Sequence, residues 1–257
     1  MIENKSSGTG VSSGKFDSGS ILGPNMNFAT AEAFKLLRTN ISFSIPEENT
    51  CRVIGVTSSI PGEGKTFTSI NLAYSIAQTD KRVLLIEGDM RLPTIAKITK
   101  LDPSPGLSNL LVGLDQKIKV VQNYANKLHI LVSGDVPPNP AELLASKRMA
   151  SLMETLSEKY DYIIMDLPPV TSVSDALIVS QYVNGIIIVA RQNYAYKKSF
   201  AETVRQLEQV NAKILGVVFN ASHESSSGYG KKYKKYGKHY MAYYKTYQKA
   251  YEDAERR

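Results

Sequence analysis

The stretch TSSIPGEGKTFTSINLA places a lysine and a hydroxyl side by side, directly after two closely spaced glycines. Gly62 and Gly64 allow backbone N–H groups to turn inward around phosphate oxygens. Lys65 can reach the outer phosphates of a nucleotide, and the Thr66 hydroxyl can ligate Mg²⁺. The strict pattern G-x-x-x-x-G-K-[ST] has glycine where this chain has Ser59. The stretch therefore predicts a phosphate-binding loop with one departure. A strand–helix turn without a ligand is the alternative.

Such a loop binds with its main chain as well as with its side chains. It precedes a helical stretch, so the partial positive charge of the helix N-terminus adds to the charge of the lysine. We predict a nucleotide and Mg²⁺ as the ligands. The residues predicted to contact the nucleotide here are Ser59, Pro61, Gly62, Glu63, Gly64, Lys65, Thr66 and Phe67.

Carboxylates in two other predicted strands could complete a metal site. In YDYIIMDLPP, a largely apolar run leads into Asp166 and two prolines end the strand. In LLIEGDMR, Glu87 and Asp89 are two residues apart, so both side chains of an extended segment point the same way. One of these two carboxylates could accept a proton from an attacking hydroxyl, and the other could help Thr66 and Asp166 hold Mg²⁺. A turn aspartate and a solvated acidic loop are the alternatives.

The rest of the sequence alternates short apolar runs with helical stretches. Runs of Ile, Val and Leu without polar alternation indicate strands covered on both faces, as in a parallel sheet. The predicted strands span 52–57, 82–89, 128–134, 160–169, 185–191 and 213–220. Predicted helices span 30–41, with Thr30 as N-cap, and 65–78, 106–113 and 141–159. The predicted fold class is α/β, a doubly wound, mostly parallel sheet of the P-loop NTPase type with helices on both faces.

Charge and tyrosine are concentrated at the end of the chain. The protein has 257 residues, a net charge of +7 and one cysteine, Cys51, which we expect in a buried strand. Residues 229–257 hold 8 of the 15 tyrosines, and their nine basic residues against three acids leave +6. The remainder is therefore nearly neutral. No apolar run reaches the ~20 residues that a membrane span needs, and no signal peptide is evident. The predicted organisation is a Ser/Gly-rich leader (1–27), a P-loop domain (28–222) and a basic Tyr-rich tail (223–257).

Taken together, the phosphate loop, the acid pair and the D-x-P-P strand resemble the bacterial tyrosine kinases, in the superfamily of the MinD and ParA ATPases. The resemblance covers about residues 28–257 and includes GLSNLLVG, PPNPAELL and the tail. It implies an ATP-dependent kinase that phosphorylates a C-terminal tyrosine cluster in trans. It also implies a role in the synthesis or export of capsule or exopolysaccharide.

The resemblance assigns roles to individual residues. The family motif D-x-D-M-R appears here as Glu87-Gly88-Asp89-Met90-Arg91. The implied catalytic residues are Lys65, Glu87, Asp89 and Asp166, with Glu87 as the base. The implied metal ligands are Thr66, Asp89 and Asp166, and the further nucleotide contacts are Arg91 and Asn220. For Asn220 a contact with adenine and a simple strand-end cap are both open. Glu87 replaces an aspartate, and a shift of ~1 Å at a reacting group can cost ~10²-fold in rate. The departure would weaken activity, so a weak kinase, a natural pseudo-kinase and an engineered variant remain open.

A second family signature, E-x-x-R-x-x-R, reads Glu32-x-x-Lys35-x-x-Arg38 in this chain. These residues fall on one helical face, and lysine lacks the bidentate fork of arginine. The resemblance implies that this strip packs protomers into a ring, for example an octamer. An ordinary solvated face is the alternative. The other implied partners are a transmembrane polysaccharide co-polymerase, whose cytoplasmic segment activates the kinase, and a cognate tyrosine phosphatase. The implied location is cytoplasmic, at the inner face of the membrane, and no nucleic acid is expected.

The tail contains the predicted phosphoacceptors, which are Tyr229, Tyr233, Tyr236, Tyr240, Tyr243, Tyr244, Tyr247 and Tyr251. Each phosphate adds about −1.5 to −2 charges at neutral pH, so three or four would cancel the charge of the tail. A packed aromatic helix and a segment bound to an anionic membrane or nucleic acid are the alternatives. The rival function is a MinD/ParA-like ATPase switch that assembles on membrane or DNA, which has no use for a tyrosine cluster.

Overall fold

The computed structural model describes residues 26, 28–46, 51–113, 121–125 and 127–221. Nearly all of the predicted leader, residues 1–27, lies outside the described residues. The same holds for the whole predicted tail, residues 223–257, with its eight predicted acceptor tyrosines. The structure therefore concerns the predicted P-loop domain.

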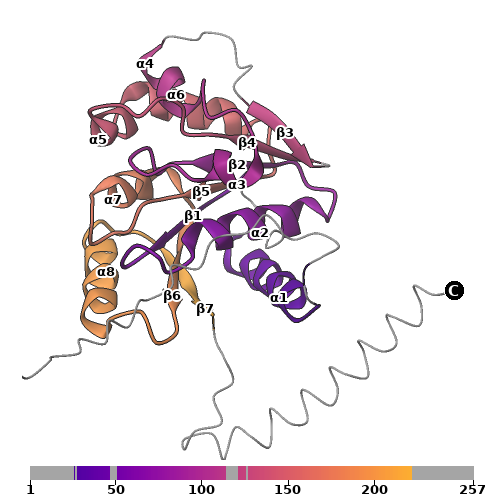
Figure 1. Ribbon diagram of the computed structural model, residues 1–257, viewed down its shortest axis with the longest axis vertical. Helices are drawn as coiled ribbons and strands as arrows, with labels where there is room; N and C mark the ends of the chain where they lie inside the picture. The colour runs from indigo at the N-terminus through magenta and orange to yellow at the C-terminus, as the bar shows by residue number, and fades with distance from the viewer. Residues whose placement is uncertain (1–25, 27, 47–50, 114–120, 126, 222–257) are drawn as a thin grey trace, which may run out of the picture.

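Strands and helices alternate along this domain (Figure 1). The strands are β1 (Arg52–Ser58), β2 (Val83–Glu87), β3 (Val121–Ala125), β4 (Leu128–Leu131), β5 (Tyr162–Asp166), β6 (Gly185–Arg191) and β7 (Ile214–Asn220). The helices are α1 (Phe28–Ser44), α2 (Lys65–Ala77), α3 (Ile95–Thr99), α4 (Leu107–Val112), α5 (Pro140–Leu144), α6 (Lys147–Ser157), α7 (Asp175–Val179), the 3₁₀ turn η2 (Ser180–Tyr182) and α8 (Lys197–Gln209).

The described strands form one seven-stranded sheet in the order β3-β4-β2-β5-β1-β6-β7. All neighbours pair in parallel except β3 and β4, which are antiparallel. The predicted doubly wound, mostly parallel fold is confirmed, whereas the edge strand β3 was not predicted. In register, Asp166 at the end of β5 pairs with Val56 on one side and with Glu87 on the other. The carboxyl ends of β1, β2 and β5 therefore meet at one edge of the sheet.

Two apolar clusters cover the two faces of the sheet. Adjacent residues of one strand point to opposite faces, so Ile54 belongs to the cluster under α1 and α2, and Val53 belongs to the cluster under α4–α8. Figure 1 shows the same division, with α1 and α2 on one side of the strands and α4–α8 on the other. Burial on both faces explains why the strands read as continuous apolar runs.

Two predicted helices differ from the structure. Helix α1 begins at Phe28, so Thr30 lies within its first turn and is not its N-cap. The single helix predicted over 141–159 is in fact α5 and α6, separated at Ser146. The Ser146 hydroxyl accepts a hydrogen bond from the Met149 N–H, an N-cap contact that is typically worth ~1 kcal/mol. This cap starts a new helix where the apolar spacing alone suggested continuity.

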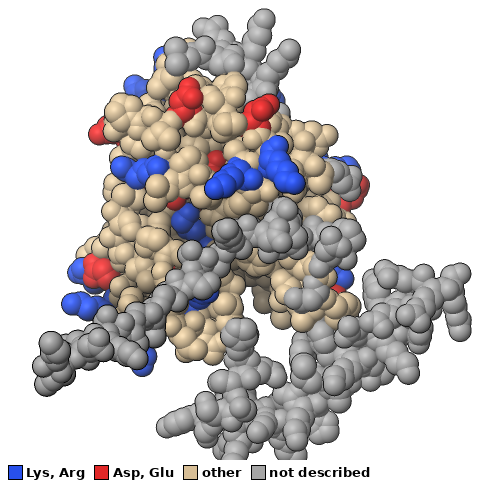
Figure 2. Space-filling model, in the orientation of Figure 1, with Lys and Arg blue, Asp and Glu red and all other residues tan. Residues whose placement is uncertain are grey.

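The surface of the domain mixes charges of both signs. In the view of Figure 2, several Lys and Arg side chains gather near the middle of the face, among uncharged surface and scattered acids. Cys51 is buried, as predicted, but it lies one residue before β1 and not within the strand. Among the described helices, none combines the length and the apolar character required to cross a bilayer.

Candidate functional site

The predicted phosphate loop joins the end of β1 to the start of α2. Gly62 and Gly64 have φ angles of +84° and +96°, the left-handed conformation that side chains disfavour. A Cβ on Gly64 would lie 2.0 Å from the Asn220 side-chain nitrogen, so no larger residue fits there unless the Asn220 side chain moves away. The strand–turn–helix context that the sequence required is present. Ser59, which stands in the place of glycine, is buried within this turn.

The loop is braced internally by one of its own acids. Glu63 is fully buried, and its Oε2 accepts the N–H groups of Ser59 at 2.7 Å and of Ile60 at 2.9 Å. Its other oxygen has no hydrogen-bond partner among the described residues. Glu63 was predicted to contact the nucleotide, whereas the role of its carboxylate in holding the first turn of the loop was not predicted.

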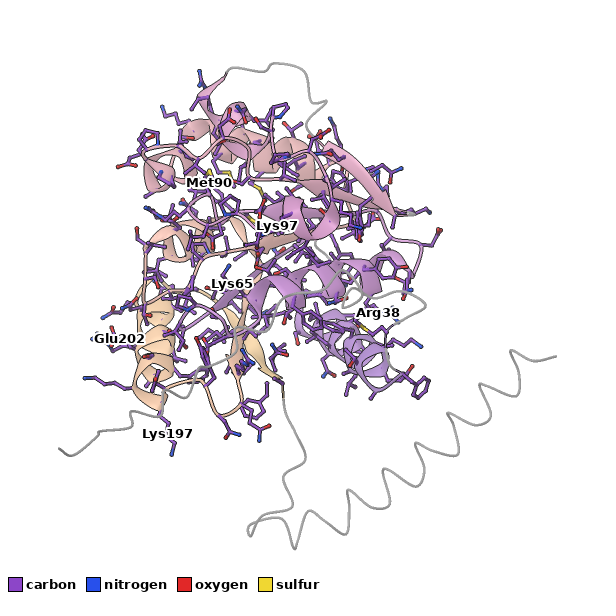
Figure 3. The ribbon with its side chains drawn as sticks, in the orientation of Figure 1. Arg38, Lys65, Met90, Lys97, Lys197 and Glu202 are labelled. Carbon is purple, nitrogen blue, oxygen red and sulfur yellow. The ribbon has the colours of Figure 1, made fainter. Side chains whose placement is uncertain are left out.

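Lys65 lies at the start of α2, where Figure 3 labels it, and contacts the acids predicted to share its site. Its ammonium nitrogen is 3.0 Å from Asp89 Oδ2 and 3.9 Å from Asp166 Oδ2. Burial lowers the pKa of Lys65, but the nearby Asp166 and Asp89 carboxylates outweigh that effect and hold the pKa above its ordinary value. The lysine is therefore charged at neutral pH, in a position where it balances two acids.

Asp166 is buried at the end of β5 and is held by hydroxyl groups of α2. It accepts hydrogen bonds from Thr66 Oγ1 at 2.7 Å and from Ser69 Oγ at 3.0 Å. Mg²⁺ at nucleotide sites is typically held by one or two carboxylates together with phosphate oxygens, so this oxygen-rich group fits it. Within the described part of the chain, no three His, Cys, Asp or Glu side chains form a metal cage by themselves. Ser69 was not predicted, although its place one turn after Lys65 could have indicated it.

Glu87 and Asp89 do not point the same way, contrary to the prediction from their spacing. Strand β2 ends at Glu87, so Gly88 and Asp89 lie beyond the extended segment on which the prediction depended. Glu87 is 1% exposed and its carboxylate accepts backbone N–H groups of Thr94, Ile95 and Ser133. Burial raises the pKa of Glu87 above its ordinary value, against the opposing effect of these donors. Asp89 alone of the pair contacts Lys65.

Comparison with known proteins shows to which family this chain belongs. A family model described as an AAA domain matches residues 51–217. The tyrosine-protein kinase YwqD of Bacillus subtilis is 36% identical over 207 residues, which are 79% of this chain and 87% of that protein. The chain belongs to the bacterial tyrosine kinase family.

Further relatives support this assignment to the family. The tyrosine-protein kinase CpsD of Streptococcus pneumoniae is 38% identical, over 77% of this chain and 87% of that protein. Other relatives are much longer, and the matched part is 28% of the kinase ptk of Acinetobacter johnsonii and 26% of the kinase etk of Escherichia coli. The solved kinase domain of Escherichia coli ETK has a TM-score of 0.71 at 36% identity, and covers 77% of this chain and 80% of that structure. MinD of Pyrococcus horikoshii shares the fold, with a TM-score of 0.59 at 21% identity over 68% of this chain and 72% of that structure.

Of three other residues predicted to contact nucleotide, two have protein partners in this member of the kinase family and the third is exposed. The Arg91 guanidinium forms a two-pronged ion pair with Asp175, which is fully buried at the start of α7 and was not predicted. The Phe67 ring packs against Phe34 of α1, 5.8 Å between centroids. Pro61 is exposed at the loop. The predicted contacts of these three with ATP remain predictions.

Asn220 and the loop after β6 lie against the phosphate loop. The Asn220 side-chain N–H donates to the Glu63 carbonyl at 2.9 Å. Arg191 donates to the Gly62 carbonyl and stacks on the ring of Tyr194, whose hydroxyl lies close to Gly62. Neither Arg191 nor Tyr194 was predicted, because nothing in RQNYAY resembles a phosphate-loop motif.

The strip on α1 is partly engaged within the chain. Lys35 Nζ is 2.6 Å from Glu32 Oε1, so these two residues share a helical face as predicted. Arg38 donates to the Ser75 carbonyl of α2, and Figure 3 places it on α1, well away from Lys65. The role of the strip in self-association remains a prediction.

Proposed function

We propose that this protein is an ATP-dependent protein-tyrosine kinase that phosphorylates tyrosines of its own tail, in trans within a ring of protomers. The observation that carries the proposal is the position of Lys65. It lies within 3.0 Å of Asp89 and 3.9 Å of Asp166, at the mouth of a strand–loop–helix turn of the kind that grips phosphate. The sequence places eight tyrosines after residue 228 to receive the phosphoryl group.

Each part of the site has a role in this transfer. Lys65 and the loop N–H groups bind the phosphates and hold the terminal phosphoryl group in place. Thr66, Asp89 and Asp166 would hold Mg²⁺, which neutralises charge on the phosphates when bound. A carboxylate of the Glu87-Gly88-Asp89 segment takes the proton of the tyrosine hydroxyl. Arg91 and Asn220 would be further contacts with the nucleotide.

The cellular role follows from the resemblance to the family. We propose regulation of capsule or exopolysaccharide synthesis or export, activation by the cytoplasmic segment of a transmembrane co-polymerase, and reversal by a tyrosine phosphatase. The protein would then work at the inner face of the membrane through that partner. Phosphorylation of three or four tyrosines, at about −1.5 to −2 charges each, would neutralise the tail and release it from acidic surfaces.

The test is mass spectrometry of the purified protein after incubation with ATP and Mg²⁺, with and without the partner's cytoplasmic peptide. We expect phosphate on Tyr229–Tyr251 in the wild type and none in Lys65→Met. The matched control is Lys97→Met, the same change at an exposed lysine of α3, which should behave like the wild type. Comparing protein concentrations separates transfer in trans, whose rate per molecule rises with concentration, from transfer in cis.

One second candidate uses the same loop and carboxylates, and the likeness of the fold to MinD favours it. In this alternative ATP binding and slow hydrolysis control assembly, and no tyrosine is modified. ATP hydrolysis and nucleotide-dependent self-association without any phosphotyrosine, with the activating peptide present, would favour the switch over the kinase.

A further inference from the structure

Glu87 is a buried acid whose two oxygens are both occupied by main-chain donors. Its Oε1 accepts the N–H groups of Thr94 at 2.5 Å and of Ile95 at 2.6 Å. Its Oε2 accepts the N–H of Ser133 at 3.1 Å, just after β4. The side chain is 1% exposed. A base for an incoming tyrosine needs a lone pair that faces the substrate, and here the oxygens are turned to the protein's own backbone.

The three donors belong to segments that would otherwise lack partners. Ile95 is the first residue of α3, and its N-cap, Thr94, makes no side-chain capping bond. The first N–H groups of a helix have no partner within the helix and require an acceptor from outside. Glu87 supplies that acceptor, and it also joins the end of β2 to the residues that follow β4.

The same contacts close a short loop on itself. Residues 88–93 leave β2 at Glu87 and return to Glu87 at the start of α3, because the carboxylate binds the N–H groups of Thr94 and Ile95. Asp89 lies inside this closed segment. Its Oδ2 accepts from Lys65 at 3.0 Å, and its Oδ1 accepts the Leu92 N–H at 3.1 Å. The place of Asp89 beside the lysine is therefore set by a loop that Glu87 holds shut.

We propose that Glu87 is a positioning residue: its carboxylate holds the 88–93 loop shut and thereby fixes Asp89 against Lys65. The effect of this positioning on tyrosine transfer rests on the proposed function.

This proposal explains the glutamate at a place where the family motif has aspartate. The extra methylene extends the side chain by one carbon–carbon bond, ~1.5 Å. That extension lets the carboxylate reach the start of α3. An aspartate at residue 87 would fall short of these donors. The longer side chain is thus required to close the loop, and it does not represent a base that has been moved out of place.

The deciding variant is Glu87→Asp, for which the two roles predict opposite results. If Glu87 positions the loop, the shortened side chain lowers the melting temperature, and the amides of Thr94, Ile95 and Ser133 exchange hydrogen ~10-fold faster or more. Tyrosine transfer then falls and does not rise. If Glu87 is a misplaced base, the family residue raises transfer and leaves amide exchange unchanged, which would overturn the proposal. Glu154→Gln, at an exposed glutamate of α6, is the control.

A second variant, Glu87→Gln, keeps the length of the side chain but removes its charge. We expect the amides of Thr94, Ile95 and Ser133 to exchange faster than in the wild type here too, because a neutral amide oxygen is a weaker acceptor than a carboxylate.

Melting and amide exchange require no kinase activity. If the wild type transfers nothing even with the activating peptide, the proposed function fails and exchange still decides whether Glu87 closes the loop. Unchanged exchange of the three amides in both Glu87 variants would overturn the loop closure itself.

Discussion

Four buried carboxylates near the phosphate loop divide into two pairs according to what holds them. Glu63 and Glu87 accept only main-chain N–H groups, whereas Asp166 is held by side-chain hydroxyls and Asp89 by the Lys65 ammonium and one N–H. A main-chain donor cannot turn away unless its segment rearranges. Side-chain rotamers change in picoseconds to nanoseconds where space allows. The first pair therefore builds the site, and the second pair can exchange its partners for phosphate and metal.

The largest effect should come from the side-chain-held pair. We expect Asp166→Asn to reduce tyrosine transfer by ~10³-fold, because the buried charge beside Lys65 and Thr66 is lost where phosphate charge must be balanced. Initial rates of phosphotyrosine formation measure it. Asp161→Asn, at the opposite end of β5 where the residue pairs with exposed Arg82, is the matched control and should retain the wild-type rate. Equal losses in the two variants would mean that β5 is merely destabilised.

A smaller effect should follow from the backbone-held Glu63. Glu63→Ala leaves the N–H groups of Ser59 and Ile60 without their acceptor, and an orphaned buried donor costs ~1–3 kcal/mol. We expect ADP affinity to fall ~10-fold in calorimetry and the melting temperature to fall with it. Glu63→Gln keeps one acceptor oxygen, so its ADP affinity and melting temperature should lie between those of the wild type and of Glu63→Ala. Tighter ADP binding by Glu63→Ala would contradict the division, because the carboxylate would then compete with phosphate.

A still smaller effect is expected for Asn220, an uncharged residue that contacts the same loop. Asn220→Ala removes one hydrogen bond to the Glu63 carbonyl, worth ~1 kcal/mol, so ADP affinity should fall ~5-fold. Calorimetry with GDP in parallel distinguishes the two roles left open for Asn220. If Asn220 braces the loop, Asn220→Ala should weaken the binding of ADP and GDP equally. If Asn220 contacts adenine, the variant should lose the preference of the wild type for ADP over GDP.

The smallest effect concerns a buried group without a charged role, at the other end of β1. Burial raises the pKa of the Cys51 thiol from 9.0 to about 11. At pH 8 iodoacetamide should therefore modify it ~10²-fold more slowly than an exposed thiol. The stabilising effect of the protonated thiol is full below pH 9.0 and is lost as the pH rises through about 11. Rapid alkylation of the native protein at pH 8 would contradict this burial.

The sequence predicted the parts of the site that depend on local pattern. Gly64, Lys65 and Thr66 follow a strand and open a helix, and continuous apolar runs indicated the parallel strands. It did not predict contacts that chain folding creates between distant segments. The pairing of Arg91 with Asp175 depends on how α7 packs, and the separation of Glu87 from Asp89 depends on where β2 ends. Ser146 is a residue type that often caps a helix, and it marks the break between α5 and α6 in the sequence. The helical spacing of apolar residues on both sides of it nevertheless indicated one continuous helix.

The contact between Asn220, at the end of β7, and the phosphate loop limits how far from the site the predicted acceptors can be. Because β7 is parallel to its neighbour β6, the chain leaves the sheet at the same edge as Lys65. Tyr229 follows nine residues later, which corresponds to at most ~30 Å of extended chain. Whatever ring forms, the chain length alone keeps the first predicted acceptor within ~30 Å of Asn220. Dilution that dissociates a ring would leave this tether intact, so any phosphate that persists at low concentration should be concentrated on Tyr229 and its nearest neighbours.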